Sequence, residues 1–170
     1  KIDNFESFLN PKIKNLLPNP SSLKDMNIAI DRTYKSIAKT DTIGIFGDYD
    51  VDGATSTALL TRYFLSIKQK IKTHIPDRQK EGYGPSLKGF EYLINKGAKI
   101  IFTVDCGTLS YEPIKLAQKL NVDVIVLDHH QSDINLPEAC ALVNPNRYDD
   151  TSGLNYLCAA VECFIFLIAL

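Results

Sequence analysis

The stretch TIGIFGDYDVDGATSTALLTRYFLSI, residues 42–67, contains the pattern that decides the expected fold. It begins with an apolar run at residues 42–46, passes through a polar turn rich in aspartate, and continues with helical spacing over residues 54–67. A buried strand, a polar turn and a helix in this order are typical of a βαβ unit. The stretch therefore predicts a parallel sheet with helices packed against it.

The same alternation of apolar runs and helical patterns continues along the chain. Apolar runs predict further strands at residues 71–75, 99–104 and 122–127, with a weaker fifth at 141–143. Helical spacing predicts helices at residues 86–95 and 110–120, and residues 76–85 are expected to form one long polar connection. Because the strands are apolar almost throughout, both faces of the sheet are expected to be covered. The predicted fold class is α/β, with an open, mainly parallel sheet flanked by helices.

Residues 1–41 are expected to form an N-terminal segment that ends in a helix, and residues 42–170 the main domain. Prolines at positions 11, 18 and 20 interrupt the start of the segment. Ser21 and Ser22 are candidate N-caps for the helix that follows. Its apolar residues recur at helical spacing: Leu23, Met26, Ile30, Tyr34 and Ile37.

The run from residue 158 to residue 170 is apolar apart from Glu162. A helix that spans a membrane needs roughly 20 apolar residues, so this shorter run predicts a buried helix of a globular domain. A carboxyl group buried in such a helix would be costly. The sequence offers no explanation for Glu162.

The composition is that of a globular protein, with 170 residues of which 45% are hydrophobic and 23% charged. The formal net charge of −1 excludes a basic field over the whole domain, so a polyanionic substrate would need a local site. The four cysteines form no C-x-x-C pair, and nothing at the N-terminus resembles a signal peptide. Reduced thiols and a cytoplasmic location are expected, with no membrane partner.

Charged side chains follow the predicted strands where each strand ends. The first strand is followed by Asp48, Asp50 and Asp52, and the second by Asp77 and Arg78. The third is followed by Asp105, and the fourth by the run Asp128-His129-His130. The carboxyl ends of parallel strands share one edge of an open sheet, and ligands bind outside that edge. We therefore expect these acids to converge.

Such a cluster of carboxylates requires cations, because the groups would otherwise repel each other and become protonated. Carboxylate oxygens with one or two imidazoles suit Mn²⁺ or Mg²⁺, whereas a structural zinc site would use thiolates. Two such ions can clamp the attacking and leaving oxygens of a phosphoryl displacement. The cluster therefore predicts two bound Mn²⁺ or Mg²⁺ ions and metal-assisted hydrolysis of a phosphoester or phosphoanhydride.

Other interpretations of these residues were weighed. An EF-hand is excluded because its twelfth position is Leu59 and a strand precedes the loop. The nucleophile loop of a haloacid-dehalogenase-type phosphatase remains a weaker alternative, with Asp149 and Asp150 as its later acidic pair. Taken alone, the aspartate at position 105 and Gly107 would be a plain turn, and His74 inside a predicted strand is expected to be structural.

Three segments together resemble a known family. They are the run from Gly47 to Ser56, the segment Thr103-Val104-Asp105-Cys106-Gly107, and the run Asp128-His129-His130. These resemble the first three motifs of the DHH phosphoesterase superfamily. Residues 75–78, the run Glu81-Gly82-Tyr83-Gly84 and residues 143–147 are similar to its branch of single-strand-specific 5′→3′ DNA exonucleases.

The resemblance implies roles for the residues that bind metal. It makes Asp50 and Asp52 ligands of two different ions, Asp105 the carboxylate that bridges them, and His129 a ligand of one ion. It also makes Asp105 part of the catalytic set together with His130 and Asp128.

The resemblance also implies roles for the residues around the ions. It places His130 opposite the scissile phosphate, where a donor stabilises developing charge. Asp128 would orient the histidines. Asp48 would support the ligands or bind metal directly, and Arg78 is the candidate ligand for a DNA phosphate.

The sequence departs from the family pattern in three places. Phe46 stands where many members have a metal-binding histidine, which favours the exonuclease branch over the pyrophosphatases. The family's fourth motif, a further metal-binding aspartate, would lie past Leu170, as would the C-terminal substrate-binding domain. The resemblance thus implies a DHH domain truncated at its C-terminal side. Where family members have a small, glycine-containing helix start, this chain has Ala160 to Cys163, which includes Glu162.

The function that the resemblance implies is removal of nucleotides from the 5′ end of single-stranded DNA in repair and recombination. Single-stranded DNA is then the expected partner, together with other DNA-repair proteins. One alternative is a DHH phosphodiesterase acting on short oligonucleotides or cyclic dinucleotides. A non-catalytic DHH scaffold is a weaker alternative, because all ligand positions within these 170 residues are intact.

Overall fold

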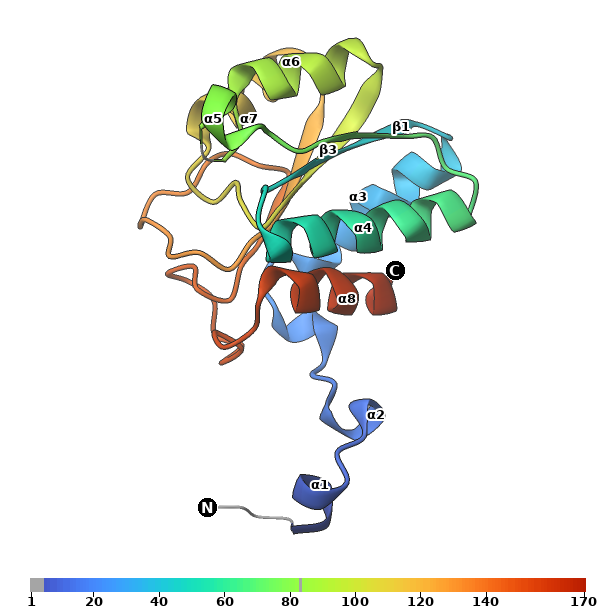
Figure 1. Ribbon diagram of the computed structural model, residues 1–170, viewed down its shortest axis with the longest axis vertical. Coiled ribbons are helices and arrows are strands. Elements are labelled where there is room, and N and C mark those ends of the chain that lie inside the picture. The colour runs from blue at the N-terminus through green and yellow to red at the C-terminus, as the bar shows by residue number, and fades with distance from the viewer. Residues whose placement is uncertain (1–4, 83) are drawn as a thin grey trace.

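The computed structural model describes residues 5–82 and 84–170, and these form a parallel sheet with helices on both faces (Figure 1). The sheet has five strands in the order β2-β1-β3-β4-β5, all paired in parallel. The strands are β1 (Thr42–Gly47), β2 (Ile71–His74), β3 (Ala98–Val104), β4 (Asp123–Leu127) and β5 (Ala141–Val143). The predicted α/β class and all five predicted strands are confirmed, with boundaries that differ by one residue.

Helices cover the two faces of the sheet in separate layers (Figure 1). One layer consists of α3 (Met26–Ala38), α4 (Val51–Ser66) and α8 (Ala159–Ala169), and the other of α6 (Leu87–Asn95) and α7 (Tyr111–Lys119). Alternate strand residues point into the two layers. Ile43 and Ile45 belong to the core beneath α4, whereas Phe46 belongs to the core beneath α6.

The starts of the helices follow from local capping. Helix α4 begins at Val51, earlier than the sequence pattern predicted, because the Asp50 carboxylate accepts a hydrogen bond from Gly53 N at 3.0 Å. Pro113 lies in the first turn of α7, where its missing N–H leaves no helical hydrogen bond unmade. The connection predicted as a polar loop contains a short helix, α5 (Arg78–Glu81), which Asp77 caps by accepting from Gln79 N.

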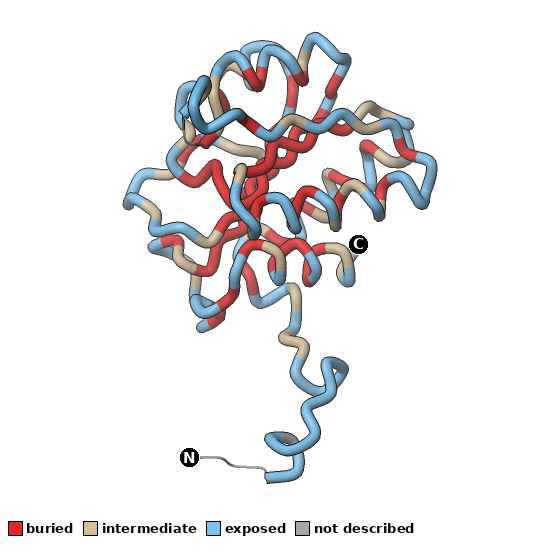
Figure 2. The backbone as a smooth tube through the Cα atoms, in the orientation of Figure 1, coloured by how far each residue is buried: buried red, intermediate tan, exposed pale blue. Residues whose placement is uncertain are grey.

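The N-terminal segment contains two short helices, α1 (Phe5–Leu9) and α2 (Ile13–Leu16), and the 3₁₀ turn η1 (Pro20–Ser22). Figure 2 shows most of this segment as exposed, extending away from the buried sheet. The prediction that Ser21 or Ser22 caps the following helix was wrong. Both lie in η1, and the N-cap of α3 is Asp25, in the left-handed region at φ 62°.

The predicted apolar stripe of α3 was partly wrong. Met26 is buried, but Tyr34 is exposed and donates a hydrogen bond from its hydroxyl to Leu170 O at 2.6 Å. The small polar side chains of Thr33 and Ser36 are buried instead. Thr33 is accommodated because its hydroxyl donates to Ala29 O in the preceding turn.

Helix α8 forms where the apolar C-terminal run predicted a buried helix, and it packs against α4. Across the residues that the structure describes, no helix combines the length and the apolar character that crossing a membrane requires. The first turn of α8 lies at the edge of the sheet where the carboxyl ends of the strands meet, as its hydrogen bonds to Asp52 show.

Candidate metal centre

The loop after β1 and the first turn of α4 carry three aspartates. Gly53 allows this first turn to lie close to the loop. A Cβ atom on Gly53 would lie 2.5 Å from Asp48 O, so only glycine fits between this loop and the first turn of α4. Asp48 is buried and continues the sheet, since its N–H donates to Val104 O at 3.2 Å. Asp50 is exposed and caps α4, and Asp52 is partly exposed on its first turn.

The loops after β3 and β4 bring further acids to the same edge. Asp105 adopts a left-handed conformation at φ 60°, and its N–H donates to Leu127 O at 3.0 Å. Its side chain is only 1% exposed, and within the described part of the chain neither carboxylate oxygen has a hydrogen-bond partner. Asp128 is equally buried, and its N–H donates to Val143 O.

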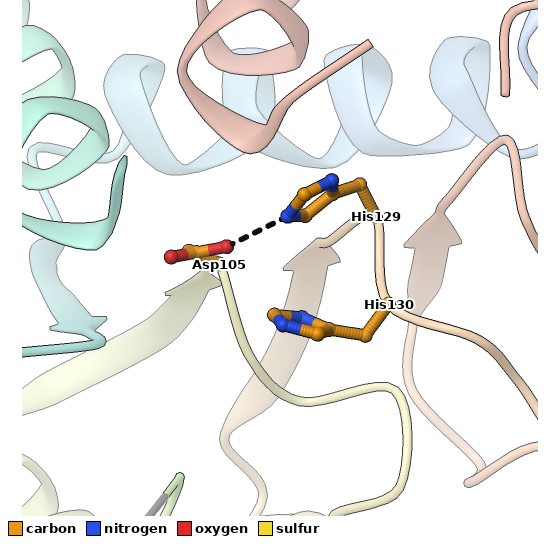
Figure 3. A group of neighbouring side chains, drawn as sticks. All are labelled: Asp105, His129 and His130. Atoms are coloured by element: carbon orange, nitrogen blue, oxygen red, sulfur yellow. Dashed lines mark ion pairs between the residues drawn. The ribbon is translucent and has the colours of Figure 1, made fainter. Parts of the chain in front are cut away.

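These residues form two groups whose potential ligand atoms lie within 4.8 Å of one another. One group contains Asp48, Asp50 and Asp105, and the other contains Asp105, His129 and His130. Figure 3 shows the second group, with His129 directed at the carboxylate of Asp105; their Nε2 and Oδ1 atoms are 3.2 Å apart. Asp105 is shared by both groups, which is the position of a carboxylate that could bridge two ions.

Asp52 lies beside these groups but belongs to neither of them among the described residues. Its Oδ2 is 3.6 Å from His129 Nε2. Its two oxygens also accept hydrogen bonds from Ala159 N at 2.9 Å and Ala160 N at 2.8 Å, at the N-terminus of α8. The helix dipole favours a carboxylate there, so α8 fixes Asp52 in place.

Asp128 holds the two histidines by a set of hydrogen bonds. Its Oδ1 accepts from His129 N at 2.8 Å and His130 N at 3.2 Å, and lies 2.7 Å from His130 Nδ1. Its Oδ2 accepts from Thr108 N. These bonds fix the His130 ring with Nδ1 toward Asp128 and Nε2 directed away from it.

The charges at this edge perturb the pKa values strongly. Burial, together with Asp50 and Asp52, raises the pKa of Asp105 to about 8. The hydrogen bond to Asp128 raises the pKa of His130 to about 9. Burial raises the pKa of Asp48, whereas the bond from Gly53 N lowers that of Asp50. Burial also acts to raise the pKa of Asp128, but its bonds to His130 and Thr108 outweigh this and lower it.

The donor set fits divalent cations that prefer oxygen. Asp105 is a buried acid whose two oxygens accept no hydrogen bond from the described residues, and its pKa is raised, so positive charge bound next to it would favour the carboxylate. Carboxylates with imidazoles are the donors that Mn²⁺ and Mg²⁺ accept. Burial raises the pKa of the neighbouring Cys106 thiol, which therefore offers no thiolate.

Arg78 lies at the start of α5, exposed and outside both groups. Its guanidinium carbon is 5.2 Å from the centre of the Tyr49 ring, a cation–π contact that holds it next to the aspartate loop. Tyr49 was missed at the sequence level, although it stands between two candidate site residues. Tyr83, which contributed to the family resemblance, lies outside the described residues.

Two asparagines that sequence reasoning left without a role support the histidine loop. Asn144 Nδ2 donates to His130 O at 2.9 Å and to Thr108 Oγ1 at 2.8 Å, and Asn146 Nδ2 donates to His129 O at 2.5 Å. Both follow β5 in the run Asn144-Pro145-Asn146-Arg147. Polar residues directly after a buried strand were the available signal.

The acids of the phosphatase alternative serve a different purpose. Asp149 pairs with Arg147 at 2.6 Å and with Lys24 at 2.5 Å, and Asp150 accepts from Lys24 N. Neither belongs to the two groups at the strand edge.

His74 pairs with Glu81 at 3.0 Å and packs against Phe46, as expected of a structural histidine.

A cavity of about 710 Å³ opens beside the histidine loop. It is lined by Asp128 and His130, by the loop from Cys106 to Ser110 with the start of α7, and by Gly84 and Pro85. This volume lies within the range of small-molecule sites, roughly 300–1,000 Å³. A ligand of nucleotide size could therefore reach His130.

The sequence is similar to those of known proteins. The sequence profile of the DHH family, N-terminal domain, matches residues 42–167. The chain is 38% identical over 128 residues to the single-stranded-DNA-specific exonuclease RecJ of Bacillus subtilis, covering 75% of this chain and 16% of the relative. It is 34% identical over 163 residues to RecJ of Escherichia coli, covering 95% of this chain and 28% of the relative. The chain thus spans about a sixth to a quarter of the length of these relatives.

Solved RecJ structures share the fold. Exonuclease RecJ bound to manganese matches with a TM-score of 0.78 and 29% identity, over 87% of this chain and 37% of that chain. RecJ of Thermus thermophilus in complex with Mn²⁺ matches with a TM-score of 0.71 and 25% identity, over 87% of this chain and 21% of that chain. From the profile match over most of its length, together with these likenesses, the chain belongs to the DHH family.

Proposed function

We propose that the protein is a nuclease that depends on divalent metal and hydrolyses the phosphodiester bonds of single-stranded DNA from the 5′ end. The similarity to RecJ exonucleases supports the substrate, and the manganese in the similar structures supports the cofactor, Mn²⁺ or Mg²⁺. The observation that carries the proposal is the buried Asp105 carboxylate, which is shared by two groups of ligand atoms and accepts no hydrogen bond from the described residues.

The proposed ligands are the residues that the three loops bring together. Asp50 and Asp52 serve two different ions, Asp105 bridges them, and His129 completes one of the sites. Asp48 is close enough to Asp50 and Asp105 to bind metal or to hold a water at the site. When bound, divalent cations supply Lewis acidity and lower the pKa of water at the site.

His130 and Asp128 contribute through charge and orientation. The raised pKa of His130 keeps its ring protonated at neutral pH in the metal-free protein, so that it is a cationic donor. A scissile phosphate in the adjoining cavity would accept a hydrogen bond from Nε2 while negative charge develops on its oxygens. Asp128 keeps the ring in that orientation through its bond to Nδ1.

Arg78 is the proposed contact for the DNA backbone. Its guanidinium is exposed beside the aspartate loop, and guanidinium groups bind phosphate through paired hydrogen bonds. The activity belongs to DNA repair and recombination in the cytoplasm, where other repair proteins are the expected partners.

The test is degradation of single strands by the full-length protein with Mn²⁺. We expect label at the 5′ end to appear as mononucleotide, and both Asp105→Asn and chelation to abolish its release. Asp31→Asn changes an exposed aspartate on α3 in the same way and should leave the rate unchanged. Release that survives both Asp105→Asn and chelation would refute the proposal, and preference for dinucleotides over long strands would favour the oligonucleotide phosphodiesterase instead.

A further inference from the structure

Glu162 is a fully buried acid in an otherwise apolar helix. It lies in α8, one turn from the N-terminus, and is 0% exposed. Among the described residues, neither of its carboxyl oxygens has a hydrogen-bond partner. Burying a polar group without a partner is unfavourable, by roughly 1–3 kcal/mol from mutational data. An apolar side chain would suit the interior of the fold better at this position.

Capping of its own helix does not explain Glu162. Carboxylates near a helix N-terminus are favourable when they accept from its unpaired N–H groups. In α8 the N–H groups of Ala159 and Ala160 already donate to Asp52. The N–H of Glu162 donates to Cys158 O within the helix.

The position of Glu162 relates it to the metal centre. The hydrogen bonds to Asp52 fix the first turn of α8 against the candidate ligands. Side chains of a helix lean toward its N-terminus, so that of Glu162 leans toward this turn. The charged groups that act on it most strongly come from three elements: Asp128 after β4, Asp52 on α4 and Asp105 after β3.

The surroundings keep Glu162 neutral when no cation is bound. Burial raises its pKa well above the ordinary value, and the charges of Asp128, Asp52 and Asp105 raise it further. Cys158 on the adjoining loop adds to the same effect. The groups that act on it most strongly are therefore acids and a thiol, which oppose its ionisation.

We propose that Glu162 is a further acidic group of the metal centre. It lies behind the converging ligands and stabilises divalent cations that bind at the strand edge. The inference rests on the proposed metal dependence. Glu162 is absent from both groups of converging ligand atoms among the described residues, so its effect on the cations is through its charge. Its unfavourable burial is offset only when cations are present.

The test compares Glu162→Gln with wild type in the full-length protein, by calorimetric titration with Mn²⁺ and by thermal unfolding with and without Mn²⁺. We expect Mn²⁺ affinity to fall about tenfold or more. Without metal, the variant should unfold at the wild-type temperature or above it, because a neutral amide replaces an acid among acids. Glu162→Leu should likewise be at least as stable as wild type without metal, because it fills the apolar position.

Control variants and outcomes separate this inference from the proposed function. Glu91→Gln makes the same chemical change on the exposed face of α6 and should alter neither measurement. Wild-type affinity in Glu162→Gln, or the same shift in unfolding temperature with and without Mn²⁺, would show that Glu162 is merely structural. Loss of folding in the metal-free Gln and Leu variants would overturn the inference too. If wild type itself binds no Mn²⁺, both the inference and the proposed function fail.

Discussion

At the scale of single residues, the chemistry of each buried acid depends on whether its neighbours are hydrogen-bond donors or other carboxylates. Asp105 and Asp128 are both buried at strand ends, yet their pKa values shift in opposite directions. Asp128 is bonded to His130 and Thr108, whereas Asp105 faces other carboxylates. Asp128 is therefore satisfied within the fold, whereas Asp105 is the residue that we propose binds metal.

The Asp128–His130 pair gives a prediction about pH. Replacing Asp128 by Asn should lower the pKa of His130 from about 9 toward its ordinary value of 6.5, since the bond to Asp128 is the main cause of the shift. The raised folded-state pKa means that the pair stabilises the metal-free protein fully below about pH 6.5, and that this contribution is lost as the pH rises through 9. Titration of the His130 ring by NMR measures the shift.

Thermal unfolding of the same variant from pH 6 to pH 10 provides the second measurement. The gap in stability between wild type and Asp128→Asn should close as the pH rises. Asp31→Asn, on the exposed face of α3, serves as the matched control. A His130 pKa that stays near 9 in Asp128→Asn would contradict the assigned cause.

At the scale of elements, the candidate site depends on how tightly a helix can approach the loop after a strand. Helix α4 meets the loop of β1 at Gly53, and α8 meets Asp52 through its first two N–H groups. In both contacts, backbone atoms of a helix lie directly against a residue of the candidate metal centre. Small shifts of either helix should therefore be felt at the metal centre.

Gly53→Ala tests the first contact. The added Cβ would lie 2.5 Å from Asp48 O, so the first turn of α4 must shift, at an expected cost of about 1–3 kcal/mol in the free energy of unfolding. Mn²⁺ affinity should fall as well, because Asp50 and Asp52 move with that turn. Chemical denaturation and calorimetry measure the two effects. Thr55→Ala, at an exposed position of the same helix, should change neither, and an unaltered Gly53→Ala protein would refute the steric argument.

The ion pairs of Asp149 tie the N-terminal segment to the loop after β5. Arg147 and Lys24 lower the pKa of Asp149 to about 2. Since a lowered folded-state pKa stabilises above the ordinary value of 3.8, this contribution is present at neutral pH and lost as the pH falls toward 2. Asp149→Asn should therefore be less stable than wild type at pH 7 and equally stable near pH 2. Thermal unfolding across this range measures the difference, and a gap that persists at pH 2 would contradict it.

Much of the arrangement of strands and helices could be predicted from the sequence, because apolar runs indicate buried parallel strands directly. The strand ends then placed the acids and histidines at one edge, which the structure confirms. Helix starts were less predictable. The Asp50 side chain caps α4 earlier than the apolar pattern suggested, and α3 begins after Asp25, whose left-handed backbone makes no side-chain cap bond. The contact of Asp52 with α8 joins residues 107 positions apart, which no local pattern reveals.

At the scale of the whole molecule, a parallel sheet gathers charge at one edge that the fold alone cannot neutralise. Glu162 shows the limit of sequence reasoning here. Its burial looked like an unexplained cost within an apolar helix, and only the packing of α8 against the strand edge relates it to the other acids. The net charge of −1 thus conceals a local excess of acid, which two divalent cations would reverse next to a phosphate.

Removing metal should expose this excess. Because the pKa of Asp105 is raised to about 8 without metal, the folded protein holds a proton that the unfolded chain releases above about pH 4. The metal-free protein should therefore lose stability as the pH rises from 4 to 8. Mn²⁺ should raise the unfolding temperature more at pH 8 than at pH 6, because at pH 8 it competes less with the proton for Asp105. An equal effect of Mn²⁺ at the two pH values would contradict the raised pKa.

The central claim is that Asp105 joins two metal ions at the carboxyl edge of the sheet. Mn²⁺ binding to the full-length protein, followed by electron paramagnetic resonance and calorimetry, tests it most directly. We expect two Mn²⁺ ions per chain, with magnetic coupling between them, in wild type. In Asp105→Asn we expect the coupling to be lost and both ions to bind about 100-fold more weakly or worse. Two Mn²⁺ ions bound to Asp105→Asn with wild-type affinity and coupling would contradict the central claim.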